Sequence, residues 1–81
     1  MKVKVKLFAA LREHLGQREM EWELPEGARL ADLVAQLAKS YPIIRKNVAG
    51  LHFAVNRCYA GGSQVLRDGD EVAVLPPVGG G

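Results

Sequence analysis

Two segments near the N-terminus alternate apolar and charged residues, and this alternation constrains the fold most strongly. Lys2–Phe8 carries lysines on one face, and Arg18–Leu24 carries glutamates on one face. The apolar residues on the opposite faces are Val3, Val5, Leu7, Met20, Trp22 and Leu24. Alternation with period two is typical of half-buried strands. Antiparallel pairing of the two segments would set glutamates beside lysines, which favours the pair.

A helix is predicted to cover the apolar face of this sheet. The segment Leu30–Tyr41 repeats apolar residues at helical spacing, which indicates an amphipathic helix. Its N-cap is expected at Ala28, which offers no side-chain acceptor, and Pro42 is expected to end it. A shorter helix is expected over Ala9–Leu15, with Gly16 as its C-terminal stop.

The rest of the chain alternates turns with short extended pieces. A strand is expected at Leu51–Val55, a hairpin turn at Gly61-Gly62-Ser63, a tight turn at Asp68-Gly69-Asp70 and a last strand at Glu71–Leu75, whereas Ile43–Gly50 fits an irregular connection or a short helical turn. The order strand, strand, helix, strand, strand predicts one α+β domain over residues 1–75 and an extended tail over residues 76–81.

Composition excludes several classes of protein. The 81 residues are 48% hydrophobic and 25% charged, as in ordinary soluble domains, and no apolar run is long enough to span a membrane. A net charge of +2 and five aromatic residues do not favour nucleic-acid binding. A single cysteine, Cys58, cannot form an internal disulfide, so a reducing, cytoplasmic compartment is expected.

Catalytic groups are scarce in this sequence. His14 and His52 have no serine, cysteine or carboxylate at a spacing that suggests a dyad, and Cys58 has only Arg57 as an activating neighbour. There is no phosphate-binding loop and no Cys/His cluster for a metal, so no metal site is expected. The chain is therefore not expected to be an enzyme on its own, and its most distinctive group is the carboxylate of Gly81.

The last six residues suit the presentation of that carboxylate to a partner. Pro76-Pro77 fixes φ and removes two backbone donors, which favours a stiff, extended exit from the sheet. Gly79, Gly80 and Gly81 lack Cβ atoms and so allow another molecule to approach closely. Six extended residues reach about 20 Å. The alternative is that the glycines are an idle, disordered end.

Three apolar residues are expected at the base of this tail. By alternation Phe8 falls on the lysine-bearing face and Leu75 on the uncovered face of the sheet, and Tyr59 is a third candidate near an exposed turn. A contiguous exposed apolar patch usually marks a binding surface. A partner could hold such a patch while the tail enters its active site.

Several motifs together resemble a known family. They are Val5-Lys6-Leu7-Phe8-Ala9, Leu11-Arg12-Glu13, Ala54-Val55-Asn56, and Leu66-Arg67-Asp68-Gly69-Asp70-Glu71-Val72 leading to Pro76-Pro77-Val78-Gly79-Gly80-Gly81. Over essentially the whole chain they resemble the small, sulfur-carrying subunits of molybdopterin synthase. The resemblance implies a ubiquitin-like β-grasp: a mixed sheet, one main helix on one face and a flexible C-terminal Gly-Gly tail.

The resemblance also implies a mechanism. An ATP-dependent adenylyltransferase of the ubiquitin-activating type would adenylate Gly81, with Gly80 as the second essential glycine, and no cofactor would be bound by the chain itself. Sulfur from a persulfide donor would then replace AMP and leave a thiocarboxylate. The tail would enter the large subunit, which holds the catalytic site, and pass its sulfur to cyclic pyranopterin monophosphate.

The family's contact surface, carried over position by position, falls on Phe8, Tyr59 and Leu75. The remaining partner-binding positions are the tail residues Pro76, Pro77, Val78 and Gly79, of which Gly79 departs from the family pattern, where another small residue is frequent. The family further implies a heterotetramer of two carriers on a dimer of large subunits.

Other functions remain open from the sequence. Related carriers serve thiamine synthesis or transfer-RNA thiolation, and some double as protein modifiers. The thiamine carriers are usually shorter and lack the Pro-Pro-Val approach. A plain β-grasp interaction module with an idle tail is the alternative from a different class.

Overall fold

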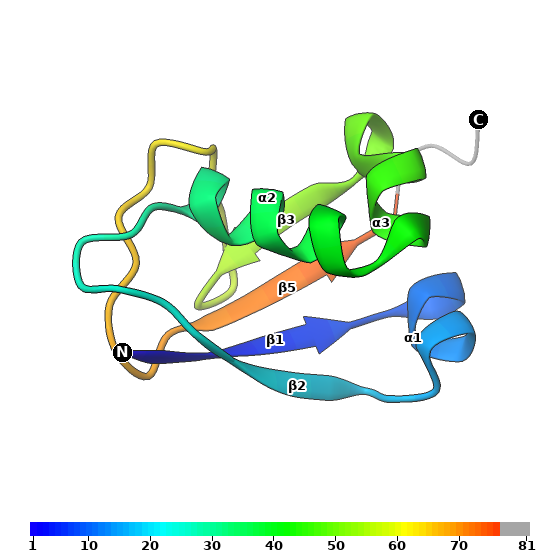
Figure 1. The fold of residues 1–81 in the computed structure, drawn as a ribbon, viewed down its shortest axis with the longest axis horizontal. Helices are drawn as coiled ribbons and strands as arrows, with labels where there is room; N and C mark the ends of the chain where they lie inside the picture. Colours follow the sequence, from blue (N-terminus) through cyan, green and yellow to red (C-terminus); the bar gives the residue numbers. More distant parts are fainter. Residues whose placement is uncertain (77–81) are drawn as a thin grey trace.

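A computed structural model describes residues 1–76 of the chain (Figure 1). The elements are β1 (Lys2–Leu7), α1 (Ala9–Leu15), β2 (Glu19–Glu23), α2 (Leu30–Ser40), α3 (Pro42–Asn47), the 3-10 turn η1 (Val48–Gly50), β3 (His52–Val55), β4 (Cys58–Tyr59) and β5 (Glu71–Leu75). The strands form one sheet in the order β2-β1-β5-β3-β4. Strands β1 and β5 run parallel and the other neighbours run antiparallel. The predicted α+β class is confirmed.

The charge pattern of the first two strands sets their pairing. Strand β1 faces β2 in the antiparallel register Lys2↔Glu23, Lys4↔Glu21 and Lys6↔Glu19. The lysines therefore lie beside glutamates, as the alternation predicted, and cross-strand pairs of opposite charge stabilise a sheet modestly. Strand β1 ends at Leu7, one residue earlier than expected, because Phe8 is the N-cap of α1.

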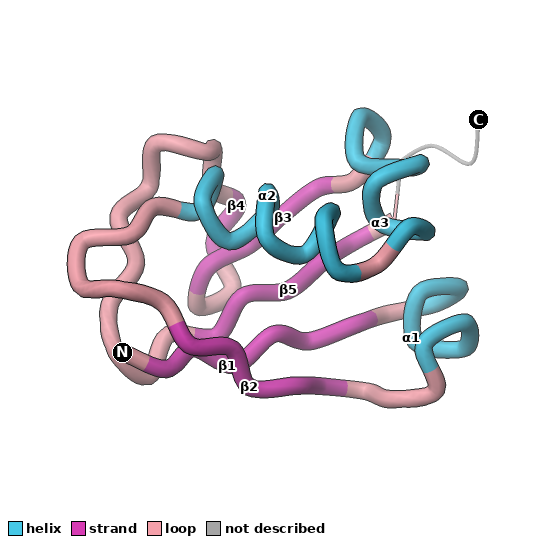
Figure 2. The backbone as a smooth tube through the Cα atoms, in the orientation of Figure 1, coloured by secondary structure: helices cyan, strands magenta, loops and turns pink. Residues whose placement is uncertain are grey.

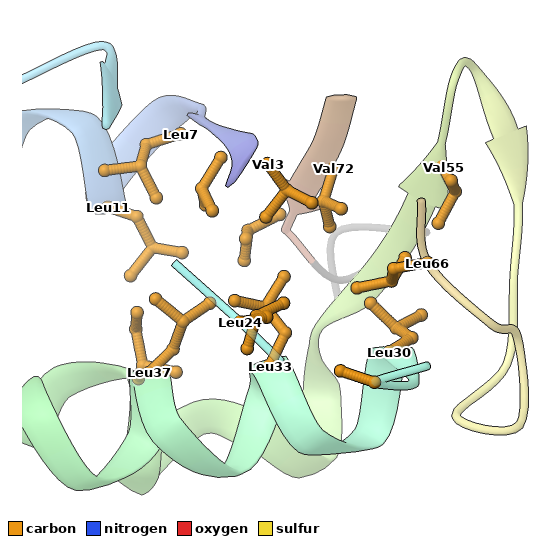
Figure 3. Close-up of a cluster of buried hydrophobic side chains, with 14 residues drawn as sticks. Val3, Leu7, Leu11, Leu24, Leu30, Leu33, Leu37, Val55, Leu66 and Val72 are labelled. Atoms are coloured by element: carbon orange, nitrogen blue, oxygen red, sulfur yellow. The ribbon is translucent and has the colours of Figure 1, made fainter. Parts of the chain in front are cut away.

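The core lies between the sheet and α2 (Figure 3). Strands contribute Val3, Val5, Leu7, Val72 and Val74, and α2 contributes Leu30, Leu33 and Leu37, all at most 2% exposed. Figure 2 shows α2 and α3 on the same side of the sheet. We call the opposite side, turned away from α2, the outer face.

Helix α2 begins at Leu30, as expected, but its N-cap is a different residue from the expected one. Its N-cap is Arg29, not Ala28, and the Arg29 amide donates to the Asp32 carboxylate over 2.8 Å. The amide of Leu30 donates to the carbonyl of Gln64 (2.8 Å), and the amide of Ala31 to that of Gly62 (3.0 Å). Helix N-termini leave amides without intrahelical partners. In α2, the carbonyls of Gly62 and Gln64, which lie in a distant loop, accept hydrogen bonds from two of these amides.

That loop also corrects the predicted hairpin. Strands β3 and β4 are joined at Asn56-Arg57, both with positive φ (50° and 71°), and not at Gly61-Gly62-Ser63. Two central residues with positive φ are what a two-residue hairpin turn requires. The Gly61-Gly62-Ser63 segment turns the chain instead toward Val65, which bridges to Arg29.

The ambiguous segment after Pro42 is helical. Pro42 follows α2, which ends at Ser40, and occupies the first turn of α3. Proline suits that position because its missing amide would have no partner there. The side chain of Ile44 is fully buried and attaches α3 to the core. Among residues 1–76, no helix has both the length and the apolar character needed to span a membrane.

Candidate functional site

The central strand of the sheet, β5, leads directly to Pro76. Strand β5 lies between β1 and β3, so both of its edges are paired, and it ends at Leu75 with Pro76 exposed directly after it. Such a strand gives the following residues a fixed point of departure. The predicted residues Pro77, Val78, Gly79, Gly80 and Gly81 lie outside the described part of the chain.

Polar side chains fix the other end of β5. Asn56 Nδ2 donates to Asp70 Oδ1 over 2.9 Å, and Asn56 Oδ1 accepts the Glu71 amide over 3.0 Å. The second oxygen of Asp70 accepts the Arg67 amide (2.8 Å), and the Lys4 amide donates to the Asp70 carbonyl (2.8 Å). This clasp ties the tight turn to β1 and to the β3–β4 hairpin. A slip of one residue in β5 would exchange its two faces, so the clasp helps to determine which side chains the strand presents.

The outer face carries charged side chains of both signs over β1 and β2, and small or apolar side chains over β5, β3 and β4. Lys6 Nζ lies 3.3 Å from Glu71 Oε2, with the two side chains 34% and 31% exposed. A pair this exposed contributes little to stability. Beyond it the register Ala73↔Ala54 and Ala54↔Tyr59 leads across small side chains toward the edge strand β4.

His52 connects two of the predicted docking residues. It is the register partner of Leu75 on β5, and its ring centroid lies 6.4 Å from that of Tyr59 in an edge-to-face arrangement. Side chains in register lie on the same face of a sheet. Tyr59 is 73% exposed, whereas Leu75 is half-buried.

Phe8 directly follows β1, which pairs with β5 on the side opposite to β3. Its backbone is extended (φ −129°, ψ 158°) and continues β1, whose last residue Leu7 faces Val74 of β5. The side chain is 40% exposed. Phe8, Leu75, His52 and Tyr59 come from the end of β1 and from β5, β3 and β4, which are neighbours in the sheet in that order, and we call these four residues the docking row.

Two features of this region were missed from the sequence. The first is the contact of His52 with Tyr59, which depends on a strand register that the sequence does not give. The second is a hollow of about 370 Å³ beside Pro76, lined by α1, α3 and η1. The sequence did not decide whether the segment that forms α3 is helical, so it could not predict the side of the hollow that α3 lines.

Within residues 1–76, no group of three or more His, Cys, Asp or Glu side chains is placed to hold a metal ion. Cys58 is exposed at the sheet edge with a free thiol. We take the docking row, together with the exposed Pro76 at the end of β5, as the candidate site.

Solved structures share this architecture. A putative molybdopterin converting factor subunit 1 from Pyrococcus furiosus superposes with a TM-score of 0.86 at 41% identity, over 96% of this chain and 99% of that one. SAMP1 from Haloferax volcanii superposes with the same TM-score at 27% identity, over the full length of both chains. The mixed sheet with helices on one side is a ubiquitin-like β-grasp, which confirms the expected fold.

Sequence comparison is consistent with the structural likeness. The chain belongs to the ThiS family, whose profile matches residues 5–81. A relative named molybdopterin synthase sulfur carrier subunit, from Mycobacterium tuberculosis, is 42% identical over 82 residues, covering 100% of this chain and 99% of the relative. The family match extends to Gly81, so it includes the glycine ending.

Proposed function

We propose that this chain is the sulfur carrier subunit of a molybdopterin synthase. The observation that carries the proposal is full-length similarity, at 42% identity, to a subunit of that name, in a family match that includes the Gly81 end. The fold supports the role, because a doubly paired central strand leads into an exposed Pro76. A carrier needs a rigid domain for recognition and a reactive end that can reach another protein's site.

The chemistry requires that Gly81 be activated. A carboxylate is a poor electrophile, so an ATP-using enzyme of the ubiquitin-activating type would first join it to AMP, releasing pyrophosphate. The terminal sulfur of a persulfide would then attack the acyl carbon and displace AMP. A thiol that reduces the resulting sulfur–sulfur bond would leave the thiocarboxylate on Gly81. No cofactor is bound by the chain in this scheme.

The large subunit would supply the catalytic site. There the thiocarboxylate would donate its sulfur to cyclic pyranopterin monophosphate, a step in molybdenum cofactor biosynthesis. The partner would bind the docking row through Phe8, Tyr59 and Leu75 and would hold the tail from Pro76 to Gly80. Aromatic residues at the centre of an interface typically contribute most of its binding free energy. Two carriers on a dimer of large subunits would form a heterotetramer.

The first experiment measures the intact mass of the chain after incubation with its activating enzyme, ATP and a persulfide donor. The expected result is an increase equal to the exchange of one oxygen for sulfur, localised to Gly81 by fragmentation. A variant without Gly80-Gly81 and a reaction without ATP are the controls. An unchanged mass, with an activating enzyme that consumes ATP on another carrier, would exclude the carrier role and leave an interaction module.

A second experiment identifies the acceptor. The thiocarboxylated chain is mixed with the large subunit and cyclic pyranopterin monophosphate, and loss of the added sulfur mass is followed together with dithiolene formation. Retained sulfur in the presence of an active large subunit would contradict the molybdopterin assignment. Isopeptide conjugates from Gly81 to lysines, seen as a ladder on a blot, would indicate a protein modifier instead.

A further inference from the structure

The hollow beside Pro76 is built at the point where the chain leaves the sheet. Its walls come from α1 on one side and from α3 and η1 on the other, and both Phe8 and Pro76 contribute to it. Figure 1 shows α1 and α3 near the ends of β1 and β5. We call this feature the exit hollow. Its volume is about 370 Å³, enough for one or two side chains but not for a folded partner.

The lining of the exit hollow combines an apolar surface with one cation. Leu11, Ile43 and Leu51 are among its apolar residues, and Lys46 is its charged one. Lys46 lies in the last turn of α3 and is exposed. A ligand suited to this site has a small apolar side chain followed closely by an anion.

The chain itself supplies such a segment. Residues 77–81 follow Pro76 directly and read Pro77-Val78-Gly79-Gly80-Gly81, with one branched apolar side chain and a terminal carboxylate. Five extended residues reach about 17 Å, so the carboxylate can return to a hollow that Pro76 already borders. Because the segment is tethered beside the hollow, its effective concentration there is high.

We propose that the exit hollow is the docking site of the chain's own C-terminal segment, with Val78 against the apolar lining and the Gly81 carboxylate paired with Lys46. Ordering glycines costs conformational entropy, and an exposed ion pair contributes little. The tail of each chain is therefore expected to alternate between a docked and a free state. Docking keeps the terminal carboxylate at the protein surface until a partner competes for it. A partner's apparent affinity then equals its intrinsic affinity multiplied by the fraction of chains whose tail is free.

The test is nuclear magnetic resonance on the full-length chain, with a sample that mixes isotope-labelled and unlabelled protein. Intramolecular contacts are expected between the methyl groups of Val78 and those of Ile43 and Leu51. The absence of these contacts, with the methyl resonances assigned, would overturn the proposal. Contacts seen only between labelled and unlabelled chains would also overturn it, because they would show the tail of a second copy in the hollow.

A pair of charge reversals tests the role of Lys46. Lys46→Glu is expected to shift the Gly81 amide resonance and to reduce the Val78 contacts at least twofold. Lys39→Glu is the matched control, because Lys39 is an exposed lysine in the last turn of α2 that does not line the hollow. Equal effects of the two variants would overturn the pairing. Neither measurement uses ATP or a sulfur donor, so failure here leaves the carrier function standing.

Discussion

The clasp at the start of β5 gives the sharpest stability prediction. Asn56 has a φ of +50° and makes two side-chain hydrogen bonds, one to Asp70 Oδ1 and one from the Glu71 amide. Replacing Asn56 with alanine removes both bonds, which are exposed and contribute about 0.5 kcal/mol each. Alanine in the left-handed region costs a further ~1–2 kcal/mol. Asn56→Ala is therefore expected to lower the free energy of unfolding by about 2–3 kcal/mol.

A glycine at the same position separates the two causes. Asn56→Gly loses the same hydrogen bonds but accepts positive φ without strain, so it is expected to be about 1 kcal/mol more stable than Asn56→Ala. The assay is urea unfolding followed by the fluorescence of Trp22, the single tryptophan. If Asn56→Ala stays within about 0.5 kcal/mol of the parent, the clasp does not stabilise the sheet. Equal losses in the two variants would refute the backbone part of the reasoning.

Three further changes test the core, a helix end and the docking row. Leu33→Ala, at a fully buried position of α2, is expected to cost about 3 kcal/mol in the same unfolding assay, and a loss below about 1 kcal/mol would contradict the core assignment. Gly16→Ala is expected to cost about 1 kcal/mol because φ there is +71°, whereas Gly61→Ala, with no atom near its added Cβ and no positive φ, should be nearly neutral. Tyr59→Ser is expected to leave unfolding within about 0.5 kcal/mol and to weaken binding of the large subunit at least about tenfold by calorimetry; unchanged binding would remove Tyr59 from the interface.

Local periodicity predicted most elements because their faces are set by burial. The alternation of Lys2–Phe8 and Arg18–Leu24 gave both strands and their pairing, and the helical stripe gave α2. Periodicity does not indicate which strands pair when they lie far apart in the sequence. The parallel pairing of β1 with β5 joins the two ends of the chain, as in Lys4↔Glu71, and no local pattern specifies it.

The wrong details share a different cause. The β3–β4 turn lies at Asn56-Arg57, where both residues have positive φ. Because arginine rarely adopts positive φ, the sequence predicted the hairpin turn at the glycines 61–62 instead. The N-terminus of α2 is capped by carbonyls of a segment more than thirty residues away, as in the bond from Leu30 to Gln64. Contacts of this kind exist only once the fold has formed, so propensity at the helix start could not reveal them.

The candidate site follows from the geometry at one end of β5, where two surfaces meet. Phe8 belongs both to the docking row on the outer face and to the exit hollow beside Pro76. A partner that binds the docking row must therefore contact a side chain that also lines the hollow. Binding of that partner and release of the docked tail would then be coupled through Phe8, because any shift of its ring changes both surfaces. Tyr59 lies at the far end of the row and does not line the hollow, so Tyr59→Ser should weaken partner binding without changing the Val78 contacts, whereas Phe8→Ala should alter both. If Phe8→Ala weakened partner binding but left the Val78 contacts intact, the two surfaces would be independent and the coupling would be wrong.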